Sequence, residues 1–206
     1  IGGLEHLTPR EVLGHRDAVA WMRAEGRLPS SIRVRELTGE RGVVPGMDGW
    51  EWVLGEGHAP GHLLPWHPDT RTLISGDQFL QGLKTPLRVA DPDEDSYGAY
   101  LESVRRVSVL EPRIMLPSHT EPIHDPARWL CRAQRRMQKQ LTRSVAAIQG
   151  APRTAEQVLD ELYRSIPGPG ARQMLLREQT AALRHLHFVG EADRILDEGI
   201  ERFAAA

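Results

Sequence analysis

The chain has 206 residues, enough for one domain or two, and 40% of them are hydrophobic, enough for a buried core. A formal net charge of −2 provides no general attraction for nucleic acid or anionic membranes. The single cysteine, Cys131, excludes an internal disulfide and a cysteine-based zinc site, and this favours a cytoplasmic protein. No apolar run approaches the length of a membrane span.

The N-terminal part is predicted to begin with a helix. Thr8, Pro9 and Glu11 have the order of an N-cap followed by a first helical turn, and an apolar stripe of helical spacing continues from Val12 as far as Gly26. A short alternating strand is predicted at 33–37, and the glycine-rich stretch 39–49 is predicted to be loop.

Residues 55–62 form a predicted loop between strands at 50–54 and 62–66. His58 and His62 are four residues apart, as in some helical zinc motifs, but Pro60 and its neighbouring glycines disfavour a helix here. A histidine on such a loop, directly after a strand, is well placed to reach a ligand or a metal.

Two further short apolar strands end in polar turns, at 72–77 and 113–119. The first ends at Asp77 and the second at His119. If these strands converge at one edge of a sheet, the two side chains and His58 supply imidazole nitrogen and carboxylate oxygen, which are ordinary zinc ligands. Taken singly, each also fits a plain structural role at a turn, at a strand end or on the surface.

The remaining segments are predicted as follows. Residues 78–87 directly follow Asp77 and are a candidate substrate-lining loop, and the acidic cluster 91–95 is expected to cap a helix at 96–108 rather than bind calcium. From residue 126 onward the pattern is almost wholly helical, with three helices and a tail at 189–203 that fits either two short strands or a last helix.

These motifs together resemble the metallo-β-lactamase superfamily. The family's G-H-x-x-G-H loop, G-D turn and P-x-H turn correspond, in the same order, to Gly57-His58-Ala59-Pro60-Gly61-His62, Gly76-Asp77 and Pro117-Ser118-His119. The family's H-x-H-x-D-H motif is absent, and the opening Ile1-Gly2-Gly3 resembles the residues that follow it. We therefore expect a chain that lacks the N-terminal half of the family fold.

The resemblance implies an α/β (α+β) fold in two parts. Residues 1–125 would be the latter part of an αββα metallo-β-lactamase sandwich, with the inner face of its sheet exposed to water. Residues 126–206 would be a mainly helical, winged-helix-like domain. We favour packing or homodimerisation over DNA binding for this domain, because its arginines form no basic stripe.

The resemblance also implies a site. His58 would bind one metal, Asp77 would bridge two metals as the catalytic carboxylate, His119 would bind the second metal, and His62 would orient the loop or the substrate. The complete protein would hold two zinc ions, and a metal-bound hydroxide would attack a thioester, a lactone or another small ester, as in glyoxalase II. With so few ligands, the segment alone is expected to be inactive. Glu56 and Ser118, where the family commonly has proline and glycine, weaken any assignment of substrate.

Three alternatives remain open at this point. A ribonuclease of the same superfamily would need the arginines of the last domain. A single-iron member that oxidises sulfur would be distinguished by its metal. A non-catalytic α/β-plus-helical interaction module, in which the histidines are incidental, would bind no metal.

Overall fold

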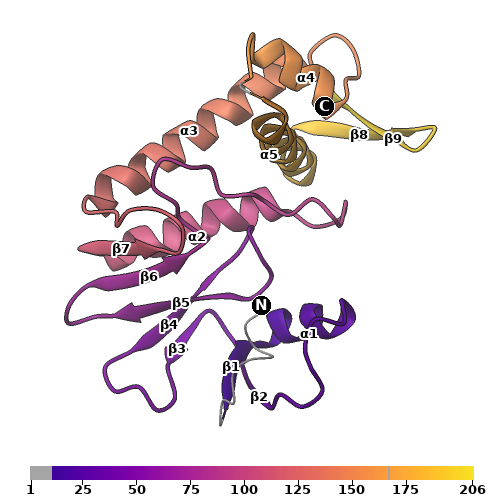
Figure 1. The fold of residues 1–206 in the computed structure, drawn as a ribbon. Coiled ribbons are helices and arrows are strands. Elements are labelled where there is room, and N and C mark those ends of the chain that lie inside the picture. Colours follow the sequence, from indigo (N-terminus) through magenta and orange to yellow (C-terminus); the bar gives the residue numbers. More distant parts are fainter. Residues whose placement is uncertain (1–10, 167) are drawn as a thin grey trace.

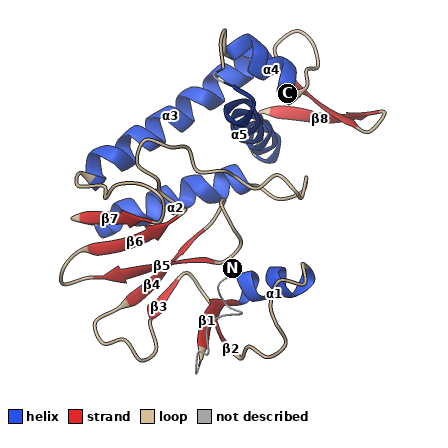
Figure 2. Cartoon of the chain, viewed as in Figure 1, coloured by secondary structure: helices blue, strands red, loops and turns tan. Residues whose placement is uncertain are grey.

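The structure is a computed structural model that describes residues 11–166 and 168–206, and its mixed α/β architecture confirms the predicted class (Figures 1 and 2). The Gly2-Gly3 opening and the start of the first predicted helix lie outside the described residues. In chain order, the elements are β1 (Val12–His15), α1 (Arg16–Ala24), β2 (Val34–Leu37), β3 (Arg41–Val43), β4 (Glu51–Gly55), β5 (His62–His67), β6 (Thr72–Gly76), α2 (Ser96–Leu110), β7 (Ile114–Pro117), α3 (Pro126–Ala147), α4 (Ala155–Leu162), α5 (Gly168–Phe188), β8 (Ala192–Asp197) and β9 (Ile200–Ala205).

A five-stranded sheet with the order β3-β4-β5-β6-β7 forms the centre of the first part. Neighbouring strands from β3 to β6 are antiparallel, whereas β6 and β7 are parallel and are joined through α2. A parallel pair needs such a crossover, because a tight turn cannot return the chain to the same edge. This topology places the C-terminal ends of β4, β6 and β7 at one edge of the sheet.

The face of the sheet toward α2 carries the main core. The strand registers align Val53 with Leu64 and Leu73 with Met115, and all four residues are fully buried. The buried residues of α2 include Tyr97, Val104 and Val107, which belong to the same apolar cluster. Each fully buried aliphatic side chain contributes about 1.5–3 kcal/mol, so this face accounts for much of the stability.

Among the described residues, the opposite face of the sheet is covered at one end only. On β4, Trp52 and Leu54 are buried in a small cluster to which Leu13 of β1 and Leu37 of β2 contribute. On β6, Ile74 remains 39% exposed. The exposure expected for this face is therefore seen at β6 but not at β4.

The predicted N-terminal helix is wrong over its central part. Residues 12–15 form β1, which pairs in parallel with β2, and α1 begins only at Arg16. The side chain of His15 caps the helix, because its Nδ1 accepts a hydrogen bond from the Asp17 amide at 3.3 Å. Val12 and Val19 therefore do not belong to one continuous helix, although their spacing fits one. Parallel pairing of β1 with a later strand leaves no signal in the local sequence.

The prediction of loop across residues 39–49 missed a strand, β3. Glycine usually weakens a strand, but here it makes room for a neighbour. A Cβ atom at Gly42 would lie 2.8 Å from the Trp52 indole nitrogen on β4, so the indole occupies the space that a side chain would take. The remaining predicted strands are confirmed to within two residues at each end.

The last part of the chain consists of α3, α4, α5 and the antiparallel hairpin β8–β9, so the tail forms two strands. Figure 1 shows α2 packed between the sheet and the long helices, and α2 contacts both α3 and α5. Buried residues of this part, among them Met137, Leu183 and Phe203, belong to the same apolar cluster as Leu73 of the sheet. The winged-helix likeness and the division at residue 125 stay predictions. No helix in the described part of the chain is long and apolar enough to cross a membrane.

One predicted helix cap is confirmed, and a second helix has a capping box. Asp95, at the end of the acidic cluster, accepts a hydrogen bond from the Gly98 amide at 2.8 Å and caps α2. Thr154 and Gln157 form a reciprocal capping box at the start of α4.

Candidate metal centre

The loop between β4 and β5 is held against the first turns of α2. Gly57 has a φ of +94°, and a Cβ atom at this position would lie 2.5 Å from the carbonyl oxygen of Ser96. Only glycine tolerates both the positive φ and the close approach of this carbonyl oxygen. The amide of Glu56 donates to the Ser103 hydroxyl at 2.7 Å, and the Gln78 side chain donates to the Glu56 carbonyl at 2.6 Å. These contacts fix the residue that follows, His58.

The orientation of His58 is set by a backbone carbonyl. Its Nδ1 lies 2.9 Å from the carbonyl oxygen of Pro86. A carbonyl only accepts, so Nδ1 carries the proton and the neutral ring has its lone pair on Nε2. That nitrogen lies 3.8 Å from Oδ2 of Asp77. A histidine whose second nitrogen donates to a carbonyl is the usual arrangement in metal sites.

Asp77 follows the end of β6 and lies between two histidines. Its other oxygen, Oδ1, is 3.3 Å from Nε2 of His119, which follows β7, and accepts a hydrogen bond from the Ser118 hydroxyl. His119 is the most open of the three, with 70% of its side chain exposed. The structure thus brings the predicted residues His58, Asp77 and His119 together around one carboxylate.

His62 lies beside this group, at the start of β5. Its ring centroid is 5.8 Å from that of His58, and its buried Nδ1 has no hydrogen-bond partner among the described residues. Burial and the neighbouring His58 lower the pKa of His62, against the opposing effects of a Gln78 hydrogen bond and the Asp77 carboxylate. Burial therefore disfavours the charged form of His62.

The donor types and the orientation of His58 suit a metal, but the set is not closed. Within residues 11–166 and 168–206, no group of three or more histidine, cysteine, aspartate or glutamate side chains is arranged to hold a metal ion. His58, Asp77 and His119 therefore fit a metal as part of a larger set of ligands rather than as a complete site.

An open pocket of about 410 Å³ lies over this group. One wall is the α1 region, with Ala18, Trp21 and Met22, and the other carries His58, His62 and Asp77. Sequence reasoning missed the contribution of α1, because the position of that helix depends on the pairing of β1 with β2. It also missed the Pro86 carbonyl, since no side chain marks a backbone acceptor.

The C-terminal helix α5 anchors the predicted substrate-lining loop. Lys84 forms an ion pair with Glu178 of α5, whose carboxylate is nearly buried. Arg184, also on α5, donates to the carbonyl of Val89 at 2.9 Å and pairs with Glu201 at 2.8 Å. The helix thereby steadies the segment that orients His58 through Pro86.

Comparison with known proteins identifies the family. Residues 3–119 match the family model of the metallo-β-lactamase superfamily, and this is more than half of the chain. The chain belongs to the metallo-β-lactamase superfamily. The matched region ends at His119, so it includes all three predicted ligands.

Two curated relatives come from Bacillus subtilis (strain 168). Probable metallo-hydrolase YqjP is 28% identical over 132 residues, which is 60% of this chain and 40% of the relative. Probable metallo-hydrolase YflN is 31% identical over 98 residues, which is 41% of this chain and 36% of the relative. The matched regions thus span less than half the length of either relative.

Two solved structures share the fold beyond the matched region. A β-lactamase domain protein from Burkholderia ambifaria has a TM-score of 0.75 and 28% identity, covering 88% of this chain and 56% of that chain. A metallo-β-lactamase family protein from Thermus thermophilus has a TM-score of 0.70 and 18% identity, covering 95% of this chain and 72% of that chain. Both matches must extend well past residue 119, so the helical part is common to these folds.

Proposed function

We propose that this chain contributes His58, Asp77 and His119 to the metal centre of a hydrolase that acts on a small-molecule thioester, lactone or other ester. The observation that carries the proposal is that His58 and His119 each approach one oxygen of the Asp77 carboxylate. All three residues follow the ends of strands. The names of the two Bacillus subtilis relatives, both probable metallo-hydrolases, support the reaction class.

A bound metal, for which we propose zinc, would polarise the substrate carbonyl and lower the pKa of water. The residues of the chain have separate tasks. His58 is turned toward Asp77 by the Pro86 carbonyl, and Asp77 holds negative charge between the two histidines. Burial disfavours a competing positive charge on His62. The pocket wall of Trp21 and Met22 would cover the acyl group.

The ribonuclease alternative gains little support from the last helix, because two of its three arginines are held within the protein. Arg172 is paired with Asp160 at 2.6 Å and with Glu156 at 3.0 Å, and Arg184 is only 8% exposed. Arginines held in this way are not available to a phosphate backbone. A small-molecule substrate remains the proposal that we favour.

The first test is the metal content of the purified chain, measured by elemental analysis. We expect about one zinc or more per chain, lost in Asp77→Ala and retained in Asp69→Ala, an exposed aspartate in the β5–β6 turn. Added zinc should also raise the melting temperature of the wild-type chain, because a ligand that binds only the folded state stabilises it.

Iron in place of zinc would favour the single-iron alternative. Equal, non-zero metal content in wild type and Asp77→Ala would refute the assignment of Asp77, and absence of metal from both would fit either the incomplete ligand set or the non-catalytic module. Because the ligand set is incomplete, we expect no hydrolysis of a model thioester by the chain alone. Hydrolysis that Asp77→Ala abolishes would refute that expectation while supporting the site.

A further inference from the structure

We propose that a second hollow, next to the metal centre, binds a carboxylate or phosphate group at the non-reacting end of the substrate. The hollow has a volume of about 420 Å³, within the range for small-molecule sites. Its lining includes Trp21, Arg27, His58, Leu87, Arg88 and Arg177. The proposal rests on the proposed function only for the position of the reacting ester.

Positive charge gathers in this hollow from three separate segments. Arg27 follows α1, Arg88 lies after the substrate-lining loop, and Arg177 comes from α5. A single carboxylate, Glu25, lines the hollow, and it lies 3.9 Å from Arg27. No ion pair joins Arg177 to any residue that the structure describes. The lining therefore has an excess of positive charge, although the chain as a whole is slightly negative.

Arg88 has hydrogen-bonding capacity that the protein does not use. Its Nη2 pairs with Glu94 at 3.0 Å, but its buried Nε and Nη1 have no hydrogen-bond partner among the described residues. Buried donors without acceptors are costly and uncommon, and they are often explained by a ligand or an ion. Both nitrogens lack exposed surface, so an anion in the hollow would bond to them only after the Arg88 side chain turns, whereas its positive charge already lines the hollow.

Trp21 holds two of these guanidinium groups in place. Its ring centroid is 5.3 Å from the guanidinium carbon of Arg27 and 5.5 Å from that of Arg88. Such cation–π contacts order long side chains that would otherwise be mobile. Guanidinium groups match the oxygen geometry of carboxylates and phosphates. Because these side chains are already ordered, they lose less conformational entropy when an anion binds.

The position of the hollow links it to the reaction. Trp21, His58 and Ala59 line both this hollow and the pocket over Asp77, so the two are adjacent. Pro86, Leu87 and Val89 add apolar surface to the lining of the hollow. An ester could therefore place its carbonyl near Asp77 while its charged end lies among the arginines.

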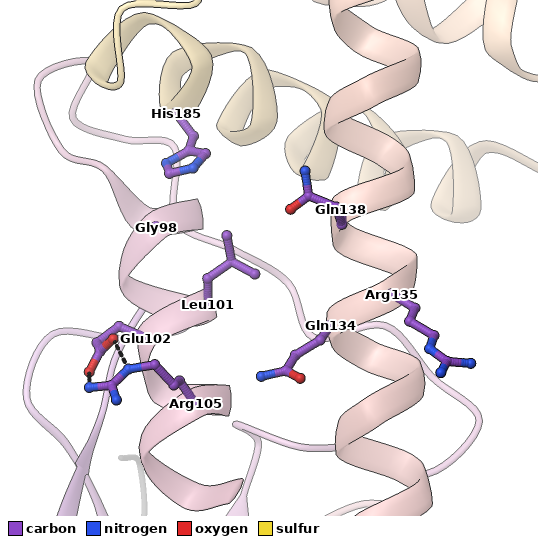
Figure 3. Close-up of a pocket in the computed structure, with 8 residues that line it drawn as sticks. All are labelled: Gly98, Leu101, Glu102, Arg105, Gln134, Arg135, Gln138 and His185. Carbon is purple, nitrogen blue, oxygen red and sulfur yellow. Dashed lines mark hydrogen bonds and ion pairs between the residues drawn. The ribbon is translucent and has the colours of Figure 1, made fainter.

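A third hollow, between α2 and α3, shows a different kind of surface (Figure 3). Arg105 and Arg135 line it, but Arg105 is paired with Glu102 through hydrogen bonds at 2.7 Å, as Figure 3 shows. His58 does not belong to its lining. These two arginines are therefore matched controls for Arg27 and Arg177.

The test is a binding measurement in EDTA, so that no metal can attract the probe. Titration calorimetry of the 206-residue chain would use phenyl phosphate, benzoate and the neutral analogue benzamide. We expect both anions to bind and benzamide to bind at least tenfold more weakly. The Arg27→Gln/Arg177→Gln variant should lose about tenfold in affinity for the anions, and Arg105→Gln/Arg135→Gln should lose none.

The two anions also identify the charged end of the substrate. Tighter binding of phenyl phosphate would indicate a phosphate, and tighter binding of benzoate would indicate a carboxylate. Absence of anion binding at millimolar concentration, equal affinity for benzamide, or equal losses in the two double variants would each overturn the proposal. The outcome does not depend on the metal. Anion binding without metal binding would support the subsite and leave the metal centre without support. Metal binding without anion binding would support the metal centre and overturn the subsite.

Discussion

The carboxylate of Asp77 approaches one histidine from the loop after β4 and another from the turn after β7. These residues were predictable from the ordered set of three motifs, whereas each motif taken singly also fits a plain structural role. What orients His58 was not predictable. The Pro86 carbonyl carries no side-chain signal, and its approach depends on the path of an irregular loop.

Asp95 offers a test of electrostatics away from the metal centre. Burial tends to raise the pKa of its carboxyl group, but hydrogen bonds from His185 at 2.9 Å and from the Gly98 amide, with the charge of His185, lower it overall. A pKa lower in the folded state than in the unfolded state gives stability above the unfolded pKa of about 3.9. That stability is lost as the pH falls through the folded pKa.

We therefore expect Asp95→Asn to lower the free energy of unfolding at about pH 5, and to lower it by less as the pH falls below about 4. Urea unfolding between pH 2.5 and 7 would measure this difference. Asp48→Asn, at an exposed turn, should change stability by less than about 0.5 kcal/mol. A difference for Asp95→Asn that grows on acidification would contradict the assignment.

At the scale of elements, the pattern of alternating and helical apolar residues predicted β4, β5, β6, α2, β7, α3, α4 and α5. It failed for β1 and β3. Parallel pairing of β1 with β2 requires partners more than twenty residues apart, and Gly42 in β3 is explained only by the Trp52 indole across the sheet. In both cases the deciding contact is tertiary, so a local pattern could not reveal it.

The ion pair between Lys84 and Glu178 joins the substrate-lining loop to α5. Replacing Lys84 with methionine would leave a nearly buried carboxylate without its partner. We expect Lys84→Met to cost about 2 kcal/mol, and Lys84→Met/Glu178→Gln to cost less than the sum of the two single variants. Thermal or urea unfolding of the three variants would measure the coupling.

The exposed pair of Glu102 and Arg105 is the control for this experiment. It lies on the surface of α2, where a pair contributes about 0–1 kcal/mol. Coupling at Lys84 and Glu178 no larger than that at Glu102 and Arg105 would show that α5 does not hold the loop by charge.

For the whole molecule, one buried apolar cluster connects Val53 of the sheet to Phe203 at the C-terminus. The predicted division at residue 125 follows a change of composition, which sequence shows well, but composition says nothing of packing across the boundary. We expect one cooperative thermal transition, with calorimetric and van't Hoff enthalpies nearly equal. Two resolved transitions would instead support two independent domains.

The position of the candidate donors has a consequence for engineering. His58, Asp77 and His119 follow the ends of strands, whereas the residues that stabilise the sheet lie in its middle. Lengthening or exchanging the turns at this edge should therefore be a practical route to new substrate preferences in a library, with little loss of folded protein. Two loops are exceptions: the loop at 78–91 is tied to α5 by its contacts, and the loop at 55–62 is held against α2.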